Sequence, residues 1–306
     1  MVNISLLYFI LRLPQINQSP YRSGFIALTT SFFFALHPQN VEAVAWIAGR
    51  KDVLSLFLLL PTLFFYLLYV QKNHQYRWYI ASLACFILAI GAKPTMMMVP
   101  ILLLVFDIYP LYRLPVLTAP LPQVIPVSLK RVLLEKLPFL LIAFIPALFA
   151  MYAHDQINNL ASLGALSFTH RVLNAAQIIL LYISHSVIPL GLAVLYPLPS
   201  LESLPIYPLI GLILITLFLF IRRQKMPVLL IAWLIFLLLL FPTLGLVSFN
   251  QVHAGSDRFT YIAAISLYLV FSLALLQLSQ YFKTKMISIV IAGLLFTACL
   301  GLTRQQ

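Results

Sequence analysis

The sequence predicts a single all-α domain over residues 1–306, built as a polytopic bundle of membrane helices. Of the 306 residues, 62% are hydrophobic and only 8% are charged, whereas soluble domains are about half apolar and a quarter charged. The apolar residues form continuous runs, many of them about 17–25 residues long, the length at which a helix crosses a bilayer. Barrel strands would instead give short alternating segments. We therefore expect an integral, multi-pass membrane protein.

Hydropathy predicts about ten membrane segments, several of them short. They are 1–11, 23–36, 53–70, 78–92, 95–109, 137–153, 205–221, 227–244, 259–280 and 286–303. Lys93 and Pro94 separate the fourth segment from the fifth, and a proline ends or kinks a helix because it lacks an N–H and clashes one turn back. These two segments form either two short spans or a deep hairpin.

The stretch 171–190 is long enough to cross the membrane but carries a polar stripe at near-helical spacing. If both of its ends lie outside, 13 of the 19 Lys and Arg residues fall on the cytoplasmic side; if it crosses, only 10 do. The positive-inside rule favours the first arrangement. We therefore expect 171–190 to be an interfacial or re-entrant helix on the outer, periplasmic or lumenal, face.

The formal net charge of +12 does not indicate a nucleic-acid partner. The basic residues occur in short clusters between apolar segments, as in "QKNHQYR" and "RRQK", which is typical of the cytoplasmic loops of membrane proteins. Cys85 and Cys299 lie inside apolar runs, so we expect small buried side chains and no disulfide. No phosphate-binding loop pattern indicates a nucleotide.

Under this topology, five of the seven acids lie at the outer face together with bases and histidines from distant loops. Among these polar residues are Glu42, Arg50, Lys51, Asp52, Lys93, His154, Asp155, His170, Arg171, His185, Asp257 and Arg258. Ionisable groups gathered at one membrane face are candidates for a functional site. They suit a substrate with a phosphate head and a hydrocarbon tail, because a base pairs with phosphate and an acid takes a proton from a hydroxyl or holds a divalent metal.

The first outer loop also has a structural interpretation. A helix over 40–50 would place Glu42, Trp46 and Arg50 on one face, where the two charges would form a surface pair of small energetic value. Trp46 would then serve as an interfacial anchor. Asp52 precedes an apolar segment and is expected to be the N-cap of that helix.

The other polar residues have structural alternatives of the same kind. Asp257 would cap the helix that follows it. Lys93 would extend its ammonium group from a helix end into the interface. His37 would cap the end of a helix, and His154 would belong to a polar loop.

Four blocks of sequence, in order, resemble those of a known family. They are "FALHPQNVEAVAWIAGRKDVLS" (34–55), "LAIGAKPTMMMVPILLLVFDIYPL" (88–111), "LYISHSVIPLGLAVLYPLP" (181–199) and "LVSFNQVHAGSDRFTYIAAISLYL" (246–269). These blocks resemble the transmembrane and tetratricopeptide-repeat proteins, which are O-mannosyltransferases in animals and have multi-pass bacterial relatives. The resemblance covers about residues 1–280, with Phe259 where the family usually has Tyr.

The resemblance implies a glycosyltransferase of the GT-C class, a helical membrane enzyme that transfers sugar from a polyprenyl-phosphate carrier at the outer face. The sugar would be mannose and the acceptor a hydroxyl of a protein or glycan. Glu42 and Asp52 would be catalytic, with Glu42 as the base or as a ligand of Mg²⁺ or Mn²⁺. The substrate-binding residues would be His37, Arg50, Lys93, His154, Asp257, Arg258 and Tyr261, with the bases on the lipid phosphate and Tyr261 lining the donor site.

The chain also departs from the family. It begins within what resembles the second helix, so the family's acidic first outer loop is missing, and it stops after the last helix without the family's tetratricopeptide repeats. We therefore expect an N-terminally truncated form and leave open whether it is active without that loop. A non-catalytic transporter of lipid-linked substrates or a membrane anchor is the alternative. A transporter predicts a polar path through the bundle, and an anchor predicts outer charges that do not line one cavity.

Overall fold

The structure is a computed structural model that describes Leu6, Ile10 and residues 19–72, 74–114, 127–157, 166–246, 253–282 and 285–304. It confirms the all-α prediction, since helices make up most of the described chain. The first expected segment, 1–11, lies almost entirely outside the described residues. Each of the other nine expected segments, and the stretch 171–190, contains an α-helix.

The α-helices follow the apolar runs closely. They are α2 (Pro20–Leu36), α3 (Val41–Ala45), α4 (Arg50–Gln71), α5 (Tyr76–Ala92), α6 (Val99–Ile108), α7 (Leu129–Ile157), α8 (Phe168–Val187), α9 (Tyr207–Ile221), α10 (Pro227–Leu240), α11 (Ala264–Tyr281) and α12 (Lys285–Thr303). Prolines at the first or second position begin α2, α6, α9 and α10, where a missing N–H costs nothing.

Short 3₁₀ helices and one small sheet connect the α-helices. The 3₁₀ helices are η1 (Pro38–Asn40), η2 (Ile47–Gly49), η3 (Pro94–Met98), η4 (Leu201–Ser203), η5 (Phe241–Thr243) and η6 (Asp257–Thr260). The strands β1 (Tyr196–Pro197) and β2 (His253–Gly255) pair antiparallel. The pairing brings the chain just before η6 beside the loop that follows α8.

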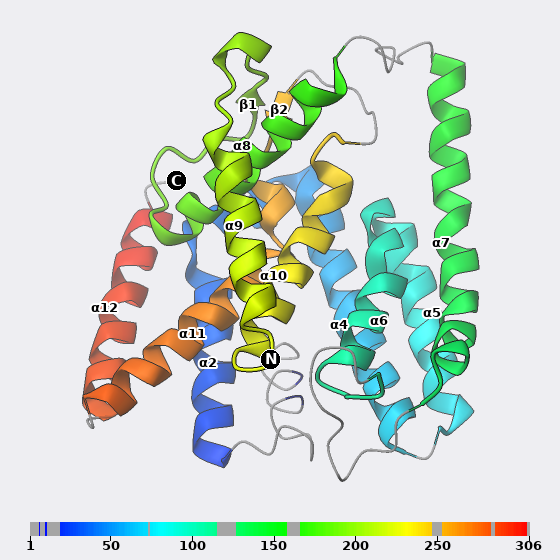
Figure 1. Ribbon diagram of the computed structural model, residues 1–306, viewed down its shortest axis with the longest axis horizontal. Helices are drawn as coiled ribbons and strands as arrows, with labels where there is room; N and C mark the ends of the chain where they lie inside the picture. Colours follow the sequence, from blue (N-terminus) through cyan, green and yellow to red (C-terminus); the bar gives the residue numbers. More distant parts are fainter. Residues whose placement is uncertain are drawn as a thin grey trace.

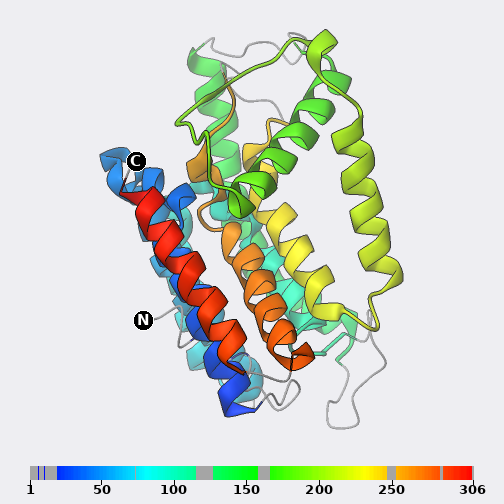
Figure 2. The ribbon, with the colours of Figure 1, turned by 90° about the vertical axis from the view of Figure 1, so that its left-hand side faces the viewer.

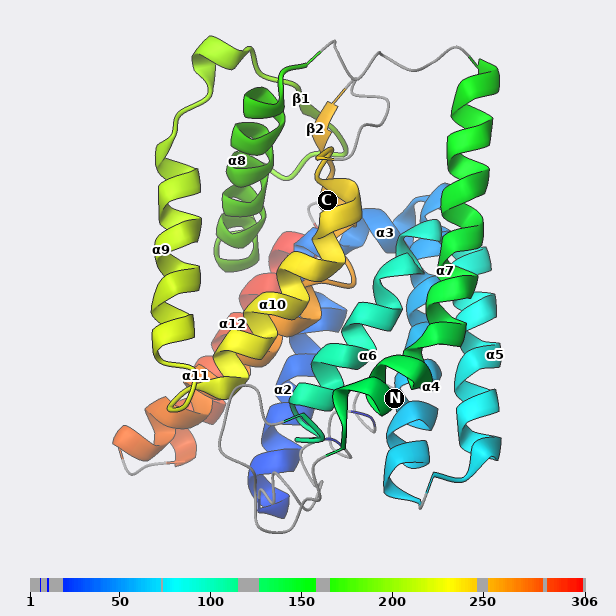
Figure 3. The ribbon, with the colours of Figure 1, turned by 45° about the vertical axis from the view of Figure 1, so that its right-hand side comes forward.

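The helices run between two ends of the molecule (Figures 1 and 3). The C-terminal ends of α4, α6, α9 and α11 and the N-terminal ends of α5, α7, α10 and α12 lie at the lower end in these views. The segment between α2 and α4, the sheet and all of α8 lie toward the upper end. Both termini of α8 also contact upper segments: His170 bonds to the Pro199 carbonyl, and Ser186 bonds to Gln39. After α8 the chain returns to the upper end, where α9 begins (Figure 3).

Three groups of helices form the core. Buried side chains of α4, α5, α6 and α7 pack around Tyr66, Phe86 and Phe139, and those of α8, α9 and α10 pack around Tyr182 and Phe236. Helices α2, α11 and α12 form the third group and run side by side (Figure 2).

Two helices are long and apolar enough to cross a membrane, judged by length and composition over the described residues. They are Ile47–Gln71 and Ala264–Tyr281. The structure also contains shorter apolar helices of 10–17 residues. They are Tyr76–Ala92, Pro94–Ile108, Tyr207–Ile221, Pro227–Thr243 and Val290–Thr303. Two spanning candidates are thus present among the ten expected segments.

A buried ionic cluster lies at the lower end. Asp107 accepts hydrogen bonds from the Tyr66 hydroxyl at 2.8 Å and from Arg113 at 2.8 Å, and it forms an ion pair with Lys136. Arg113 also pairs with Glu135 at 2.7 Å. The cluster holds the turn after α6 against α4 and α7, and every charge in it has an opposite partner, as burial of charge requires.

Three predictions about local structure were wrong. Residues 40–50 are not one helix, because Trp46 has an extended backbone (φ −78°, ψ 126°) and ends α3. Asp52 is not an N-cap, since α4 begins at Arg50 after Gly49. Asp257 does not cap the following α-helix, because it lies in η6 and α11 begins only at Ala264.

Candidate functional site

Glu42 and Arg258 form an ion pair at the upper end. The Glu42 Oε1 lies 3.1 Å from the Arg258 Nη1, and its Oε2 accepts the Arg258 backbone N–H at 3.0 Å. The Ser256 hydroxyl donates to the same carboxylate at 3.1 Å. The side chains of Glu42 and Arg258 are only 10% and 14% exposed. The segment 256–258 therefore lies directly against α3.

Burial changes the chemistry of this carboxyl. It raises the pKa of Glu42, and the N–H and charge of Arg258 and the Ser256 hydroxyl oppose that rise because they stabilise the carboxylate. The Arg258 guanidinium also lies 4.3 Å from the centre of the Trp46 ring, a cation–π distance. The break after α3 thus places the Trp46 ring against the guanidinium group of Arg258.

A second ion pair joins Asp52 to Lys93. Asp52 is buried in the first turn of α4, and the Lys93 ammonium group binds its Oδ1 at the junction between α5 and η3. The interpretation of Lys93 as a side chain reaching into the interface is wrong, because its side chain is 11% exposed. The Asp52 Oδ2 has no hydrogen-bond partner among the described residues.

The two ion pairs belong to one region. Burial lowers the pKa of Lys93, Asp52 opposes this, and the charges of Lys51 and Arg258 lower it further. Tyr261 is buried, and its pKa rises to about 12 because of burial and the negative charge of Asp52. Charges from four separate segments therefore act on one another at this end of the bundle.

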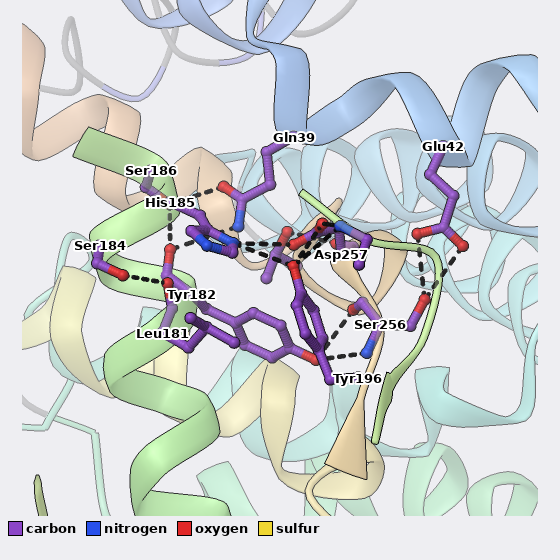
Figure 4. A network of polar contacts seen from close by, with 12 residues as sticks. Gln39, Glu42, Leu181, Tyr182, Ser184, His185, Ser186, Tyr196, Ser256 and Asp257 are labelled. Atoms are coloured by element: carbon purple, nitrogen blue, oxygen red, sulfur yellow. Dashed lines mark hydrogen bonds and ion pairs between the residues drawn. The ribbon is translucent and has the colours of Figure 1, made fainter. Parts of the chain in front are cut away.

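The segment 256–258 is held on its other side by α8 and the loop after it (Figure 4). Asp257 accepts hydrogen bonds from the Tyr196 hydroxyl at 2.7 Å and from the Ala193 N–H at 2.8 Å, and it lies 3.4 Å from the His185 Nδ1. The Tyr182 hydroxyl both donates to the Ser256 carbonyl and accepts from the Ser256 N–H. Asp257, predicted to bind substrate, thus has both carboxylate oxygens occupied.

His37 also has a structural position. It is the C-cap of α2, and its Nδ1 accepts the Gln39 N–H at 3.3 Å. Burial lowers the pKa of His37 to about 4, although a hydrogen bond with the Ser186 backbone opposes the change. The predicted helix-end cap is therefore present, and the imidazole is buried away from the surface.

Two predicted site residues lie apart from these contacts. Arg50 is exposed at the start of α4, and no hydrogen bond or ion pair joins its side chain to the described residues. His154 lies in the last turns of α7 instead of a loop, and its side chain lies outside the described part of the structure.

The residues around Glu42 do not fit a divalent metal. No group of three or more His, Cys, Asp and Glu side chains gathers within the described residues. Hydroxyl, amide and guanidinium donors already surround both oxygens of Glu42, and a neighbouring cation disfavours Mg²⁺ or Mn²⁺.

An apolar pocket of about 150 Å³ lies inside the bundle, between α4, α6, α10 and α11. Ile262, which follows Tyr261 directly, lines it together with Leu56 and Leu59 of α4. Tyr109, Pro110 and Val228 line it as well, from segments at the lower end of the bundle. Its lining residues are apolar except for Ser266 and Tyr109. The pocket thus has Ile262, the residue after Tyr261, and Val228, at the start of α10, in its wall.

Comparison with known proteins does not identify this chain. No protein-family model, curated protein or solved structure matches it.

Sequence reasoning missed several residues that build this region. Ser256 and Tyr182 were not singled out, although one binds Glu42 and the other binds the backbone of the segment 256–258. Gln39 bonds to Ser186 at 2.8 Å and was also missed. Tyr196 lies in a block that carries the family resemblance, and its position just before a proline was the only available signal.

Proposed function

We propose that this protein is a membrane glycosyltransferase that moves a sugar from a polyprenyl-phosphate carrier to a hydroxyl acceptor. The observation that carries the proposal is the ion pair between Glu42 and Arg258, which brings an acid and a base from opposite halves of the chain into one largely buried site. Glu42 comes from the first and Arg258 from the fourth of the sequence blocks that resemble the transmembrane and tetratricopeptide-repeat proteins.

In this reaction Glu42 acts as the general base. The acceptor hydroxyl replaces the Ser256 hydroxyl beside the carboxylate and gives its proton to Glu42. The hydroxyl oxygen forms a bond to the anomeric carbon while the bond from that carbon to the phosphate oxygen breaks, and the polyprenyl phosphate leaves with the electron pair. The raised pKa of Glu42 favours this role, because a more basic carboxylate takes a proton more readily.

Other residues of the region would bind the phosphate and the prenyl chain of the donor in this reaction. Arg258 and Lys93 supply positive charge near the departing phosphate, where burial strengthens their effect. The Asp52–Lys93 pair fixes the start of α4 against η3. The apolar pocket beside Tyr261 has the lining that a prenyl chain requires.

The proposal places the bundle across a membrane with the upper end outside. Helices α7 and α9 expose many large apolar side chains, among them Leu141, Phe144, Ile213 and Phe218, which suit lipid and not water. The short connections α4–α5 and α9–α10 at the lower end carry several of the Lys and Arg residues, as cytoplasmic loops do. The multi-pass topology and the outer position of the site are part of this proposal.

A second candidate function is a non-catalytic one. Both acids expected to be catalytic, Glu42 and Asp52, are already paired with a base. A membrane anchor would need those pairs only to join its segments. This alternative predicts that neutralising Glu42 weakens the fold and that the unmodified chain transfers no sugar.

A transfer assay tests the proposal. The purified chain is reconstituted in liposomes with polyprenyl-phosphate mannose carrying a labelled sugar and with a serine- and threonine-rich peptide. Glu42→Gln is expected to lower the rate by at least about 100-fold, as loss of a general base does. Glu202→Gln, which removes the same charge from an exposed position in η4, is the matched control. Unchanged turnover in Glu42→Gln would contradict the assignment of the base.

A further inference from the structure

Tyr182 of α8 contacts both segments that supply the ion pair at the upper end (Figure 4). Its hydroxyl donates to the Ser256 carbonyl at 2.9 Å and accepts the Ser256 N–H at 3.0 Å. Its backbone carbonyl accepts a hydrogen bond at 3.4 Å from the side chain of Gln39, which precedes Glu42 in the same segment. One residue of α8 thus joins the segment 256–258 to the segment that carries the acid.

The Tyr182 hydroxyl has a fixed position. The side chain is buried, and both hydrogen-bonding roles of the hydroxyl, as donor and as acceptor, are filled by Ser256. Gly255 makes the close approach possible, because a Cβ at that position would lie 2.6 Å from the Tyr182 hydroxyl. The main chain at Ser256 is therefore held at a position that α8 determines.

Ser256 extends this constraint to Glu42. Its hydroxyl donates to the Glu42 carboxylate at 3.1 Å, and the Arg258 N–H, from the same segment, donates to it at 3.0 Å. Both hydrogen bonds stabilise the charged carboxylate and oppose the rise in the pKa of Glu42 that burial causes. Their strength depends on where the main chain of the segment 256–258 lies.

Two charged groups of the same segment also act on Glu42. The charge of Arg258 lowers the pKa of Glu42, and the charge of Asp257 raises it. Asp257 has supports of its own, because three groups outside the segment 256–258 contact its carboxylate. They are the Tyr196 hydroxyl, the Ala193 N–H and the His185 imidazole. Loss of the Tyr182 hydroxyl should therefore weaken the two hydrogen bonds to Glu42 while Asp257 stays in place.

We propose that Tyr182 is a positioning residue, whose hydroxyl holds the hydrogen-bond donors of the segment 256–258 against the Glu42 carboxylate and so adjusts Glu42 as a proton acceptor. Tyr182 belongs to none of the positions carried over from the family resemblance, so the contacts alone assign it. That this adjustment serves sugar transfer rests on the proposed function, whereas the effect on Glu42 does not.

Titration of Glu42 tests the inference without any turnover. The purified full chain is reconstituted in liposomes, and the infrared band of the protonated Glu42 carboxyl, identified by its absence in Glu42→Gln, is followed against pH. Tyr182→Phe is expected to raise the midpoint by about one pH unit, a tenfold change in proton affinity, because hydrogen bonds to the carboxylate weaken. Gly255→Ala displaces the same hydroxyl without removing it and should shift the midpoint in the same direction.

Tyr79→Phe is the matched control. The Tyr79 hydroxyl also donates to a backbone oxygen, that of Glu135 at 2.7 Å, but it lies near the start of α5 at the lower end (Figure 3). Its removal is expected to leave the midpoint of Glu42 unchanged. An unchanged midpoint in folded Tyr182→Phe and Gly255→Ala, or an equal shift in Tyr79→Phe, would overturn the inference.

The transfer assay separates this inference from the proposed function. The pH profile of kcat/KM reports the base of the free enzyme, so its acid limb should move upward in Tyr182→Phe by the same amount as the infrared midpoint. A shifted midpoint in a chain that transfers no sugar would sink the proposed function and support the positioning role. An unchanged midpoint in Tyr182→Phe, with transfer lost in Glu42→Gln, would overturn the positioning role and support the proposed function.

Discussion

Arg258 binds the Glu42 carboxylate twice, through its guanidinium group at 3.1 Å and through its backbone N–H at 3.0 Å. The second bond fixes the main chain as well as the side chain. The segment before α11 is therefore joined to α3, and the same segment is joined to α8 through Asp257 and Tyr182. Any change in the Glu42–Arg258 contact should reach both α8 and the start of α11.

The two partners should be energetically coupled. Glu42→Gln or Arg258→Met leaves the other group buried and unpaired, and each is expected to lower the free energy of unfolding by about 3 kcal/mol. The double variant should cost about 1–3 kcal/mol less than the sum, because the unpaired charge is gone. Denaturant titration in mixed micelles measures these values. Purely additive costs would show that the two side chains do not interact in the folded protein.

The raised pKa of Glu42 gives the transfer rate a pH dependence. A base works only when deprotonated, so the rate should fall with decreasing pH at a value above the usual 4.5 of a glutamate. The folded state also holds this proton more tightly than the unfolded state, so the contribution of Glu42 to stability should decline as the pH rises through the same window. A rate profile that falls only below pH 4.5 would exclude Glu42 as the base.

His37 should make the fold sensitive to acid. Its pKa is lowered from 6.5 to about 4, so the unfolded chain takes up a proton more readily than the folded one. The stability is fully present above pH 6.5 and should decrease by roughly 3 kcal/mol as the pH falls to about 4. Protonation of Nδ1 would also remove the acceptor for the Gln39 N–H. Unfolding titrations at several pH values should lose most of this slope in His37→Gln, and an identical slope would contradict the assignment.

Gly255 should be intolerant of a side chain. A Cβ at this position would lie 2.6 Å from the Tyr182 hydroxyl and 3.2 Å from Ile178, and that hydroxyl is fixed by two bonds to Ser256. Gly255→Ala is expected to cost about 1–3 kcal/mol of unfolding free energy. Tyr182→Phe should cost a similar amount by leaving buried backbone groups unpaired.

The costs of Gly255→Ala and Tyr182→Phe in unfolding free energy should not add, because both substitutions break the same contact. Gly211→Ala, which has open space around it, is the matched control in a helix. A full cost for Gly255→Ala in the Tyr182→Phe background would show that the contact with Tyr182 is not the cause.

The helices were predictable from the sequence, whereas the contacts of the site were only partly so. Apolar runs define α4 and α11 because the core and the lipid select hydrophobic residues over many positions. The break at Trp46 was not predictable, since it depends on the close approach of Gly49 to Ala43, where a Cβ would lie 2.6 Å from the carbonyl oxygen. A single glycine in an otherwise helical pattern does not reveal such a contact.

Which charged residues bind one another was harder to predict than the end of the bundle at which they lie. Charge counting placed Glu42, Lys93 and Arg258 at one end, and the structure brings them together. It could not show that Lys93 binds Asp52, because that contact depends on how α4 and α5 pack. Ser256 carries no pattern of its own, since serine is common in every kind of segment.

The most direct test of the account is the side of the membrane on which each end of the bundle lies. Single cysteines are introduced at exposed positions in a Cys85→Ala/Cys299→Ala background and labelled with a membrane-impermeant maleimide in intact cells. Ile47→Cys and Glu202→Cys, on either side of α8 in sequence, should both react from outside, whereas Lys225→Cys and Tyr281→Cys should react only after permeabilisation. Labelling of Ile47→Cys and Glu202→Cys from opposite sides would contradict a single outer site containing Glu42 and Arg258.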